Sequence, residues 1–172
     1  QDLGIKFYDR DLVDEIIKEV GIPTDIMDRV EEGGTIAGKG AQGDVRGSFS
    51  KYADLTDRAI HVQKQIIRKL AQKEACVIIG RSADYILKDR EDCINIFIHG
   101  EKKEKIERIQ EICQVSPAEA EKRIKDMDKK RSVHYKYYTD REWGNVKNYA
   151  LTLNSSVLGY EKCIELIADI YR

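Results

Sequence analysis

Polar residues stand directly after four apolar runs of the sequence, at the points where strands would end. These polar residues are Asp9-Arg10, Gly80-Arg81-Ser82, His99-Gly100 and Asn154-Ser155-Ser156. In an open parallel sheet, ligands bind beyond the carboxyl ends of the strands. An arginine directly after a buried strand favours phosphate recognition, because its planar guanidinium forms paired hydrogen bonds with phosphate oxygens. We therefore interpret Arg81 as a phosphate-binding residue, whereas Arg10 fits a helix start equally well.

A second group of cations lies in the expected helix 117–138. The apolar stripe of this helix consists of Ala120, Ile124, Met127, His134, Tyr135 and Tyr138. Arg131 falls in the same stripe, which predicts that it points toward the body of the protein or a cleft. Arg123 and Lys130 lie on a neighbouring stripe, and the cluster Lys129-Lys130-Arg131 would let cations converge on transferring phosphates. The alternative is a solvated helix whose cations pair with its own acids.

Residues 33–40, with the sequence GGTIAGKG, match the GxxxxGK pattern of a phosphate-binding loop. Such a loop needs a strand before it, a helix after it, and a Ser or Thr after the lysine to hold magnesium. Here the preceding segment has a helical pattern, more glycine follows, and Gly40 replaces the hydroxyl. We interpret the match as coincidental and residues 31–50, which hold six of the 12 glycines, as a mobile loop.

Apolar runs alternate with helical patterns along the chain, which predicts βα units and a mostly parallel sheet. The expected strands are 5–8, 75–80, 94–98 and 149–153. The expected helices are 9–20, 56–72, 83–87, 102–114, 117–138 and 160–171, with a further one suggested from Pro23 to Val30. The runs at 75–80 and 94–98 are typical of strands that are buried on both faces. The 172 residues are about one domain in length.

Composition narrows the classes of function. The 30 basic and 31 acidic side chains leave a net charge of −1, which argues against a nucleic-acid binder that works through bulk charge. The four cysteines are widely spaced without a CxxC pair, so we expect reduced, mostly buried thiols. No apolar run approaches the ~18 residues of a membrane span, and no signal-peptide pattern is visible. We therefore expect a cytoplasmic protein that binds no membrane.

Five segments of the chain, in order, closely resemble the cytidylate-kinase-like family, a branch of the P-loop nucleoside monophosphate kinases. The segments are FYDRDLVDEI, VIIGRSADYIL, INIFIHG, KDMDKKRSVHYKYYT and WGNVKNYALTLNSS. The resemblance implies a three-layer α/β/α fold with a mostly parallel five-stranded sheet, whose first strand and P-loop would precede Gln1. It also implies one domain over residues 1–172, with an acceptor-side Gly-rich insertion at about 22–55 and a lid at about 115–140.

The activity that the resemblance implies is transfer of the γ-phosphoryl group of ATP, with Mg²⁺, to a nucleoside monophosphate, CMP or dCMP above all. On the acceptor side, the matching residues are Tyr8, Asp9, Arg10, Arg81 and Asp84, with Arg81 resembling the arginine that holds the acceptor phosphate. Arg108, Asn154 and Ser155 match positions near the base of ATP. Arg123, Lys130 and Arg131 resemble the cations of the lid. No residue is assigned as a metal ligand, and catalysis would rest on positioning and electrostatics.

The chain departs from cytidylate kinases proper at three places. Gly80-Arg81-Ser82 stands where those enzymes tend to carry GRD, the lid segment DMDKKRS holds fewer Arg and Asp residues, and Ala150 stands where relatives often have Asp. Two alternatives therefore stay open: a non-catalytic nucleotide-binding regulator on the same fold, or a kinase with a small acceptor other than a nucleotide. The expected partners are small-molecule nucleotides and not nucleic acid, and a homodimer is left open.

Overall fold

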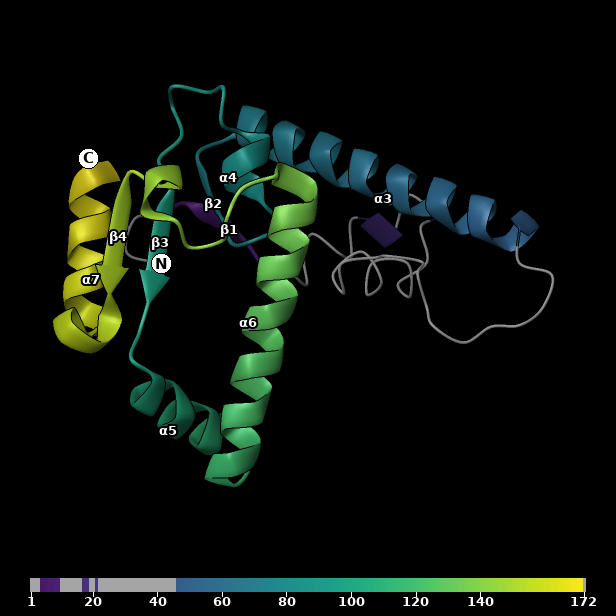
Figure 1. The fold of residues 1–172 in the computed structure, drawn as a ribbon. Coiled ribbons are helices and arrows are strands. Elements are labelled where there is room, and N and C mark those ends of the chain that lie inside the picture. Colours follow the sequence, from purple (N-terminus) through teal and green to yellow (C-terminus); the bar gives the residue numbers. More distant parts are fainter. Residues whose placement is uncertain (1–3, 10–16, 19–20, 22–45, 172) are drawn as a thin grey trace. The chain divides into compact units, whose positions relative to one another are not determined.

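The computed structural model of the chain describes residues 4–9, 17–18, 21 and 46–171, with side chains from residue 57 onward in the last range. Strands and helices alternate along the described ranges (Figure 1). In chain order they are β1 (Lys6–Tyr8), α3 (Arg46–Lys73), β2 (Cys76–Ile78), α4 (Ala83–Ile86), β3 (Ile96–His99), α5 (Lys102–Cys113), α6 (Pro117–Thr139), the 3₁₀ turn η1 (Val146–Asn148), β4 (Leu151–Asn154) and α7 (Ser155–Tyr171).

The chain divides into two compact units. The first unit comprises Gln1–Glu91 and Val133–Asp140, and the second comprises Asp92–Ser132 and Arg141–Arg172. Helix α6 therefore contributes its longer, N-terminal part to the second unit and its last turns to the first.

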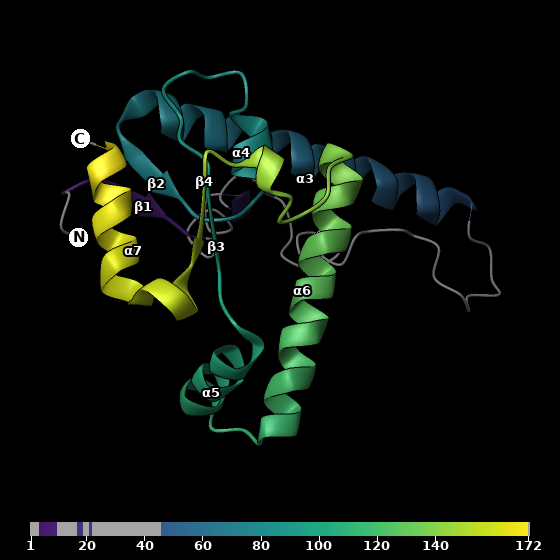
Figure 2. The same ribbon diagram turned by 60° about the vertical axis from the view of Figure 1, so that its left-hand side comes forward.

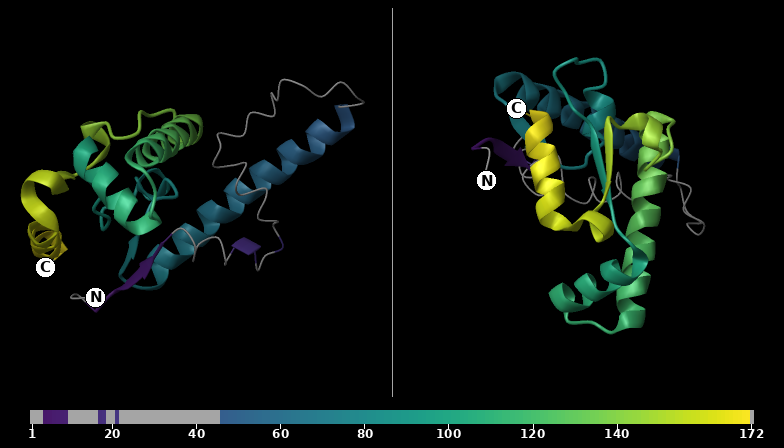
Figure 3. Two further views of the ribbon diagram at one scale, coloured as in Figure 1. Left: turned by 90° about the horizontal axis from the view of Figure 1, so that it is seen from below. Right: turned by 90° about the vertical axis from the view of Figure 1, so that its left-hand side faces the viewer.

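In the first unit, β1 and β2 pair in parallel, with Lys6 opposite Cys76 and Tyr8 opposite Ile78. Helix α3, a single long helix in Figure 3, buries residues at helical spacing beside this sheet. A core cluster forms where Tyr8 and Ile17 pack with Ala59 and Ile66 of α3. The buried face of α3 thus anchors the strand pair whose ends carry the predicted acceptor residues.

In the second unit, β3 and β4 pair in parallel, with Ile96 opposite Leu151 and His99 opposite Asn154 (Figure 2). Phe97 stacks on Tyr149 with ring centroids 4.9 Å apart and meets Trp143 edge-on at 5.5 Å. Gly144, at φ +77°, faces this ring closely, since a Cβ built there would lie 3.2 Å from Phe97. Only glycine fits that approach without displacing the aromatic cluster.

Helices α5 and α6 form a hairpin in the second unit (Figure 1). Helix α5 ends at Gln114, whose left-handed conformation, with φ at 53°, turns the chain. Ser116 then accepts a hydrogen bond from the backbone N–H of Glu119 at 3.3 Å, and Pro117 is the first residue of α6. An ion pair between Lys102 and Glu121 joins the two helices.

The order of strands and helices predicted for the described ranges is confirmed, with parallel pairing in both units. The five-stranded sheet is not shown, because the described strands form two separate two-stranded sheets. The prediction that residues 75–80 and 94–98 are buried on both faces is wrong: Val77 is 43%, Ile79 54% and Ile98 51% exposed, so one face of each strand is not covered. The domain boundaries and the lid stay predictions.

The prediction of a loop over residues 31–50 is wrong for residues 46–50, because α3 already begins at Arg46. Residues 31–45 lie outside the described ranges, as do Arg10, the helix suggested at Pro23 to Val30, most of the expected helix 9–20 and the match at 33–40. Of the cysteines, Cys163 is buried and Cys113 is exposed, so the expectation of mostly buried thiols holds only in part. None of the helices in the described part of the chain is long and apolar enough to cross a bilayer.

Candidate functional site

A strained turn follows β2. Gly80, Arg81 and Ser82 have successive φ values of 76°, 56° and 51°, all in the left-handed region. For Arg81 and Ser82 this conformation costs roughly 1–2 kcal/mol each, because the Cβ atom crowds the next carbonyl. The backbone N–H of Ala83 donates to the carbonyl of Gly80 at 3.1 Å and closes the turn into α4. Strain of this kind persists where the surrounding structure enforces it, and it is concentrated at functional sites.

The Arg81 side chain lies inside the first unit, with the residue only 8% exposed. Its backbone carbonyl accepts a hydrogen bond from Nε2 of Gln63 on α3 at 3.2 Å. A buried guanidinium is costly unless it is paired or hydrogen-bonded. Arg81 lies directly after β2, and its backbone belongs to the strained turn, while its role as a phosphate-binding residue stays a prediction.

Tyr8 and Asp9 lie at the end of β1. The backbone N–H of Ile79 donates to the carbonyl of Tyr8 at 2.8 Å, so the chain leaves β1 and β2 at the same edge of the sheet. The hydroxyl of Tyr8 instead donates to Glu74, before β2, at 3.0 Å, and Lys6 donates to the same carboxylate at 3.0 Å. These hydrogen bonds lower the pKa of Glu74, and burial followed by the bond to Glu74 raises the pKa of Tyr8.

Asp84 is the next predicted residue of the first unit. One of its carboxylate oxygens accepts a hydrogen bond from the hydroxyl of Tyr135 at 2.5 Å. Tyr135 belongs to the last turns of α6 and is only 4% exposed. The bond therefore ties the short helix α4 to α6 and holds Asp84 two residues after the strained turn.

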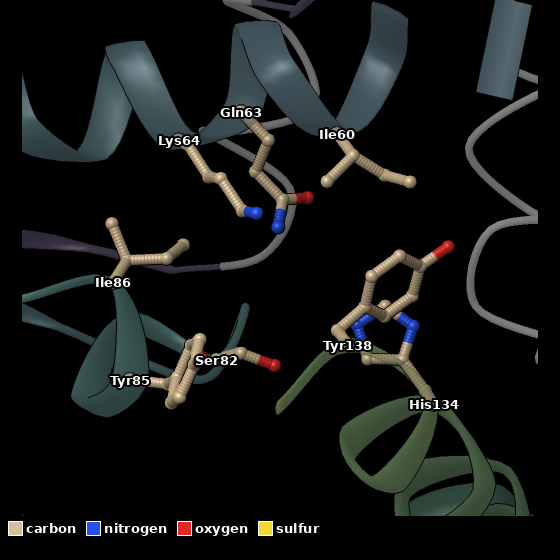
Figure 4. A pocket seen from close by; sticks show the side chains of 8 residues that line it. All are labelled: Ile60, Gln63, Lys64, Ser82, Tyr85, Ile86, His134 and Tyr138. Atoms are coloured by element: carbon tan, nitrogen blue, oxygen red, sulfur yellow. The ribbon is translucent and has the colours of Figure 1, made fainter. Parts of the chain in front are cut away.

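A pocket lies among three elements of the first unit (Figure 4). Its lining residues are Ile60, Gln63 and Lys64 of α3, Ser82, Tyr85 and Ile86 at α4, and His134 and Tyr138 of α6. None of these was among the predicted site residues. The available signal was Gln63, a polar residue at a position of the α3 stripe where its neighbours along the helix are apolar.

In the second unit, Asn154 and Ser155 hold the ends of β3 and β4 together. Nδ2 of Asn154 donates to Oε1 of Glu101 at 3.3 Å, and its Oδ1 accepts from the backbone N–H of Ser156 at 3.1 Å. The hydroxyl of Ser155 donates to the carbonyl of His99 at 3.0 Å. Both predicted residues thus lie at the carboxyl ends of the strands, and both side chains make hydrogen bonds within the protein.

Arg108 of α5 lies against Tyr160 of α7. Its Nη1 donates to the phenol oxygen at 2.5 Å, and its guanidinium carbon is 5.0 Å from the ring centroid. Tyr160 is 60% exposed, so this pair presents a flat, accessible surface of the second unit. Planar cationic and aromatic groups of this kind can stack on a nucleotide base.

The three cations predicted to belong to a lid, Arg123, Lys130 and Arg131, lie on the surface of α6. Arg123 donates to Glu119 at 3.0 Å, which raises its pKa, and Lys130 is exposed. Arg131 donates to Asp128 at 3.0 Å and lies 5.8 Å from the ring centroid of Trp143. The prediction that Arg131 points into the body or a cleft is wrong, since 54% of its side chain is exposed. Its acidic and aromatic neighbours hold it at the surface instead.

The predicted residues are therefore distributed between the units. The first unit carries Tyr8, Asp9, Arg81 and Asp84, and the second carries Arg108, Asn154, Ser155 and the three lid cations. Within the described residues, no three His, Cys, Asp or Glu side chains are grouped so that they could hold a metal ion.

Comparison with known proteins places this geometry in a family. The family model described as the cytidylate kinase-like family matches residues 1–157. The chain belongs to the cytidylate kinase-like family. The resemblance carried by the five sequence segments is thereby confirmed. Membership indicates a kinase-like enzyme with a nucleotide-kinase type of function.

A solved structure supports the fold of this family member. A crystal structure of an uncharacterized protein from Eubacterium ventriosum ATCC 27560 matches with a TM-score of 0.73 and 26% sequence identity. The match covers 99% of this chain and 85% of the other. No curated protein matches the chain.

Proposed function

We propose that this cytidylate kinase-like protein transfers the γ-phosphoryl group of ATP to a nucleoside monophosphate, with CMP or dCMP preferred. One observation carries the proposal: an arginine that is 8% exposed, fixed on a left-handed turn directly after β2, in a chain of this family. A guanidinium in such a place supplies a rigid pair of donors, which suits a tetrahedral phosphate. Arg81 would hold the phosphate of the acceptor.

The neighbours of Arg81 have supporting roles in the proposal. Asp9 and Arg10 follow β1, whose end adjoins that of β2, and would complete the acceptor side. Asp84 would accept hydrogen bonds from the ribose or base of the acceptor. Tyr8 acts through its position, because its hydroxyl bonds Glu74.

The second unit would serve ATP. Arg108 and Tyr160 offer a stacking surface for the base of ATP. Asn154 and Ser155 shape the carboxyl ends of β3 and β4. The lid cations Arg123, Lys130 and Arg131 would neutralise charge on the transferring phosphoryl group. The five-stranded sheet remains part of this proposal.

Magnesium in phosphoryl-transfer sites is usually held by substrate phosphates and only one or two carboxylates. The described side chains fit such an arrangement better than a dedicated protein cage, because they form no cluster of three acidic, His or Cys ligands. We therefore propose that Mg²⁺ enters with ATP. The expected partners are small-molecule nucleotides, and the expected location is the cytoplasm.

A coupled ADP-release assay on the full-length protein tests the proposal. The reactions contain ATP, Mg²⁺ and one of CMP, dCMP, UMP or AMP, and a reaction without acceptor corrects for ATP hydrolysis. We expect the fastest turnover with CMP or dCMP. Absence of turnover with all four acceptors would refute the proposed nucleoside monophosphate kinase. Nucleotide binding without turnover would then favour the regulator. Turnover in a further assay with a non-nucleotide acceptor would favour a different small-molecule kinase.

A further inference from the structure

Two different elements hold the guanidinium of Arg131. Its Nη1 donates to Oδ1 of Asp128, one turn earlier on α6, at 3.0 Å. Its guanidinium carbon also lies over the ring of Trp143, 5.8 Å from the centroid, which is within the range of a cation–π contact. Trp143 belongs to the segment between α6 and η1. Arg131 is therefore held from outside its own helix as well as from within it.

These two contacts make different demands on the guanidinium. The N–H donors of an arginine form hydrogen bonds in the plane of the group, whereas its attraction to an aromatic ring is electrostatic and needs no hydrogen bond. Asp128 can therefore give way to a phosphate while Trp143 stays in contact. Approach is open, because 54% of the Arg131 side chain is exposed. Oδ2 of Asp128 accepts from Nζ of Lys105 at 3.4 Å, so the carboxylate keeps a cation when Arg131 leaves it.

Trp143 is itself held by the sheet of the second unit. Its ring meets Phe97 of β3 edge-on, with centroids 5.5 Å apart, and Phe97 stacks on Tyr149 at 4.9 Å. The next residue, Gly144, allows this approach, since a Cβ there would lie 3.2 Å from Phe97. The packing of these rings restricts the indole, so the contact with Trp143 ties Arg131 to an aromatic cluster on β3.

We propose that Trp143 is a positioning residue: it holds the guanidinium of Arg131 while the N–H donors exchange Asp128 for the phosphates of bound nucleotides. The inference rests on the proposed function, because Arg131 is one of the cations proposed to neutralise the transferring phosphoryl group. An arginine side chain has much rotamer freedom to lose, and one that is already restricted loses less of it when it binds. Trp143 thus acts on turnover through Arg131.

A double-mutant cycle in kcat tests whether Trp143 acts through Arg131. The coupled ADP-release assay with ATP, Mg²⁺ and CMP compares wild type, Trp143→Leu, Arg131→Ala and the double variant. Loss of an exposed cation–π contact predicts kcat lower by about 2- to 5-fold in Trp143→Leu. We expect no further loss when the same change is made in Arg131→Ala. Equal losses on both backgrounds overturn the inference, because a merely structural role of Trp143 would be additive.

Two further variants separate the contact from the packing of Trp143. Trp143→Phe keeps an aromatic ring beside Phe97, and we expect its kcat to lie closer to that of wild type than to that of Trp143→Leu. If Trp143→Leu fails to fold, the cycle is measured with Trp143→Phe, and equal losses on both backgrounds again overturn the inference. Val146→Ala, in η1 with a side chain 64% exposed, is the control in the same part of the chain and should leave kcat unchanged.

The contact itself is measured without nucleotide, because Trp143 is the single tryptophan of the chain. Quenching of its emission by iodide, relative to quenching by neutral acrylamide, reports the charge beside the indole. Arg131→Ala removes a cation there and should lower the ratio of iodide to acrylamide quenching, whereas Lys122→Ala on the same helix should not. An unchanged ratio in Arg131→Ala overturns the contact on which the inference depends.

The two proposals fail separately in these experiments. Wild type that releases no ADP refutes the kinase, and the affinity of the same four proteins for ATP, measured by calorimetry, then replaces kcat in the cycle. Normal turnover on CMP with additive losses leaves the kinase standing and overturns the role of Trp143.

Discussion

Two cationic regions of this protein are built in opposite ways. In the first unit, Arg81 is buried and its backbone is forced into a left-handed turn, with its carbonyl bound by Gln63. In the second unit, Arg123 and Arg131 lie on the surface of α6 and pair with carboxylates of the same helix, Glu119 and Asp128. One region is fixed by the fold, and the other is held by contacts that solvent can replace.

This difference suggests a division of labour in phosphoryl transfer. Exposed ion pairs within a helix contribute only about 0.3–0.5 kcal/mol, so the carboxylates release their arginines at little cost when phosphates arrive. A buried guanidinium has no such freedom, and its place must be set when the chain folds. We therefore expect Arg81 to position an acceptor in advance and the α6 cations to respond to the bound nucleotides.

The largest predicted effect is that of Arg81→Ala. Removing a preorganised donor from a transferring or bound phosphate typically lowers the rate by about 10²- to 10³-fold, and we expect a loss in kcat/KM of this order with CMP. The coupled assay measures it, with Arg68→Ala on the exposed side of α3 as the control. A kcat/KM within about twofold of wild type would show that the fixed arginine is not used.

Arg123→Ala and Arg131→Ala are expected to act on rate without acting on the fold. Each variant removes one exposed cation of α6, and we expect turnover about 10-fold lower with a free energy of unfolding within about 0.5 kcal/mol of wild type. Denaturant unfolding and the coupled assay measure the two quantities, and Lys122→Ala on the same helix is the control. Unfolding of either variant would contradict the surface role of these residues.

Two left-handed residues allow a matched test of strain. Ser82 has φ 51° beside Arg81, and Gln114 has φ 53° at the end of α5. Glycine tolerates this conformation, so Ser82→Gly and Gln114→Gly should each stabilise the protein by about 0.5–1 kcal/mol. Ser82→Gly should also lower turnover a few-fold by loosening the turn, while Gln114→Gly leaves it unchanged. Equal turnover in both variants would show that the strain at Ser82 has no functional role.

The smallest expected effect concerns pH. Hydrogen bonds from Lys6 and Tyr8 hold the pKa of Glu74 below its ordinary 4.5, so the stabilisation from this carboxylate is complete above pH 4.5 and is lost as the pH falls through the folded-state pKa. Glu74→Gln should therefore show a smaller drop in melting temperature below pH 4.5 than wild type. Glu121, whose pKa Lys102 lowers, provides the same comparison in the second unit.

The sequence alone predicted the strands, most helices and the place of Arg81, because apolar runs, helical spacing and residues at strand ends are local patterns. It did not predict that Arg131 is exposed. The position of Arg131 in the apolar stripe predicted that its side chain faces the protein, whereas the guanidinium contacts Asp128 and Trp143 at the surface. The start of α3 at Arg46 was not predicted, because the glycines of residues 31–50 favour a loop. The pocket was missed because its lining residues come together only through tertiary packing.

The role of Arg81 is the central claim, and it is tested most directly by comparing CMP with cytidine, which lacks the phosphate. Calorimetry on wild type and Arg81→Ala gives four affinities without any turnover. We predict that the variant loses most of its affinity for CMP, by at least about 10-fold for a charge-assisted hydrogen-bonded pair, and keeps that for cytidine. Equal losses for both ligands, or none for either, would contradict the assignment of Arg81 to the acceptor phosphate.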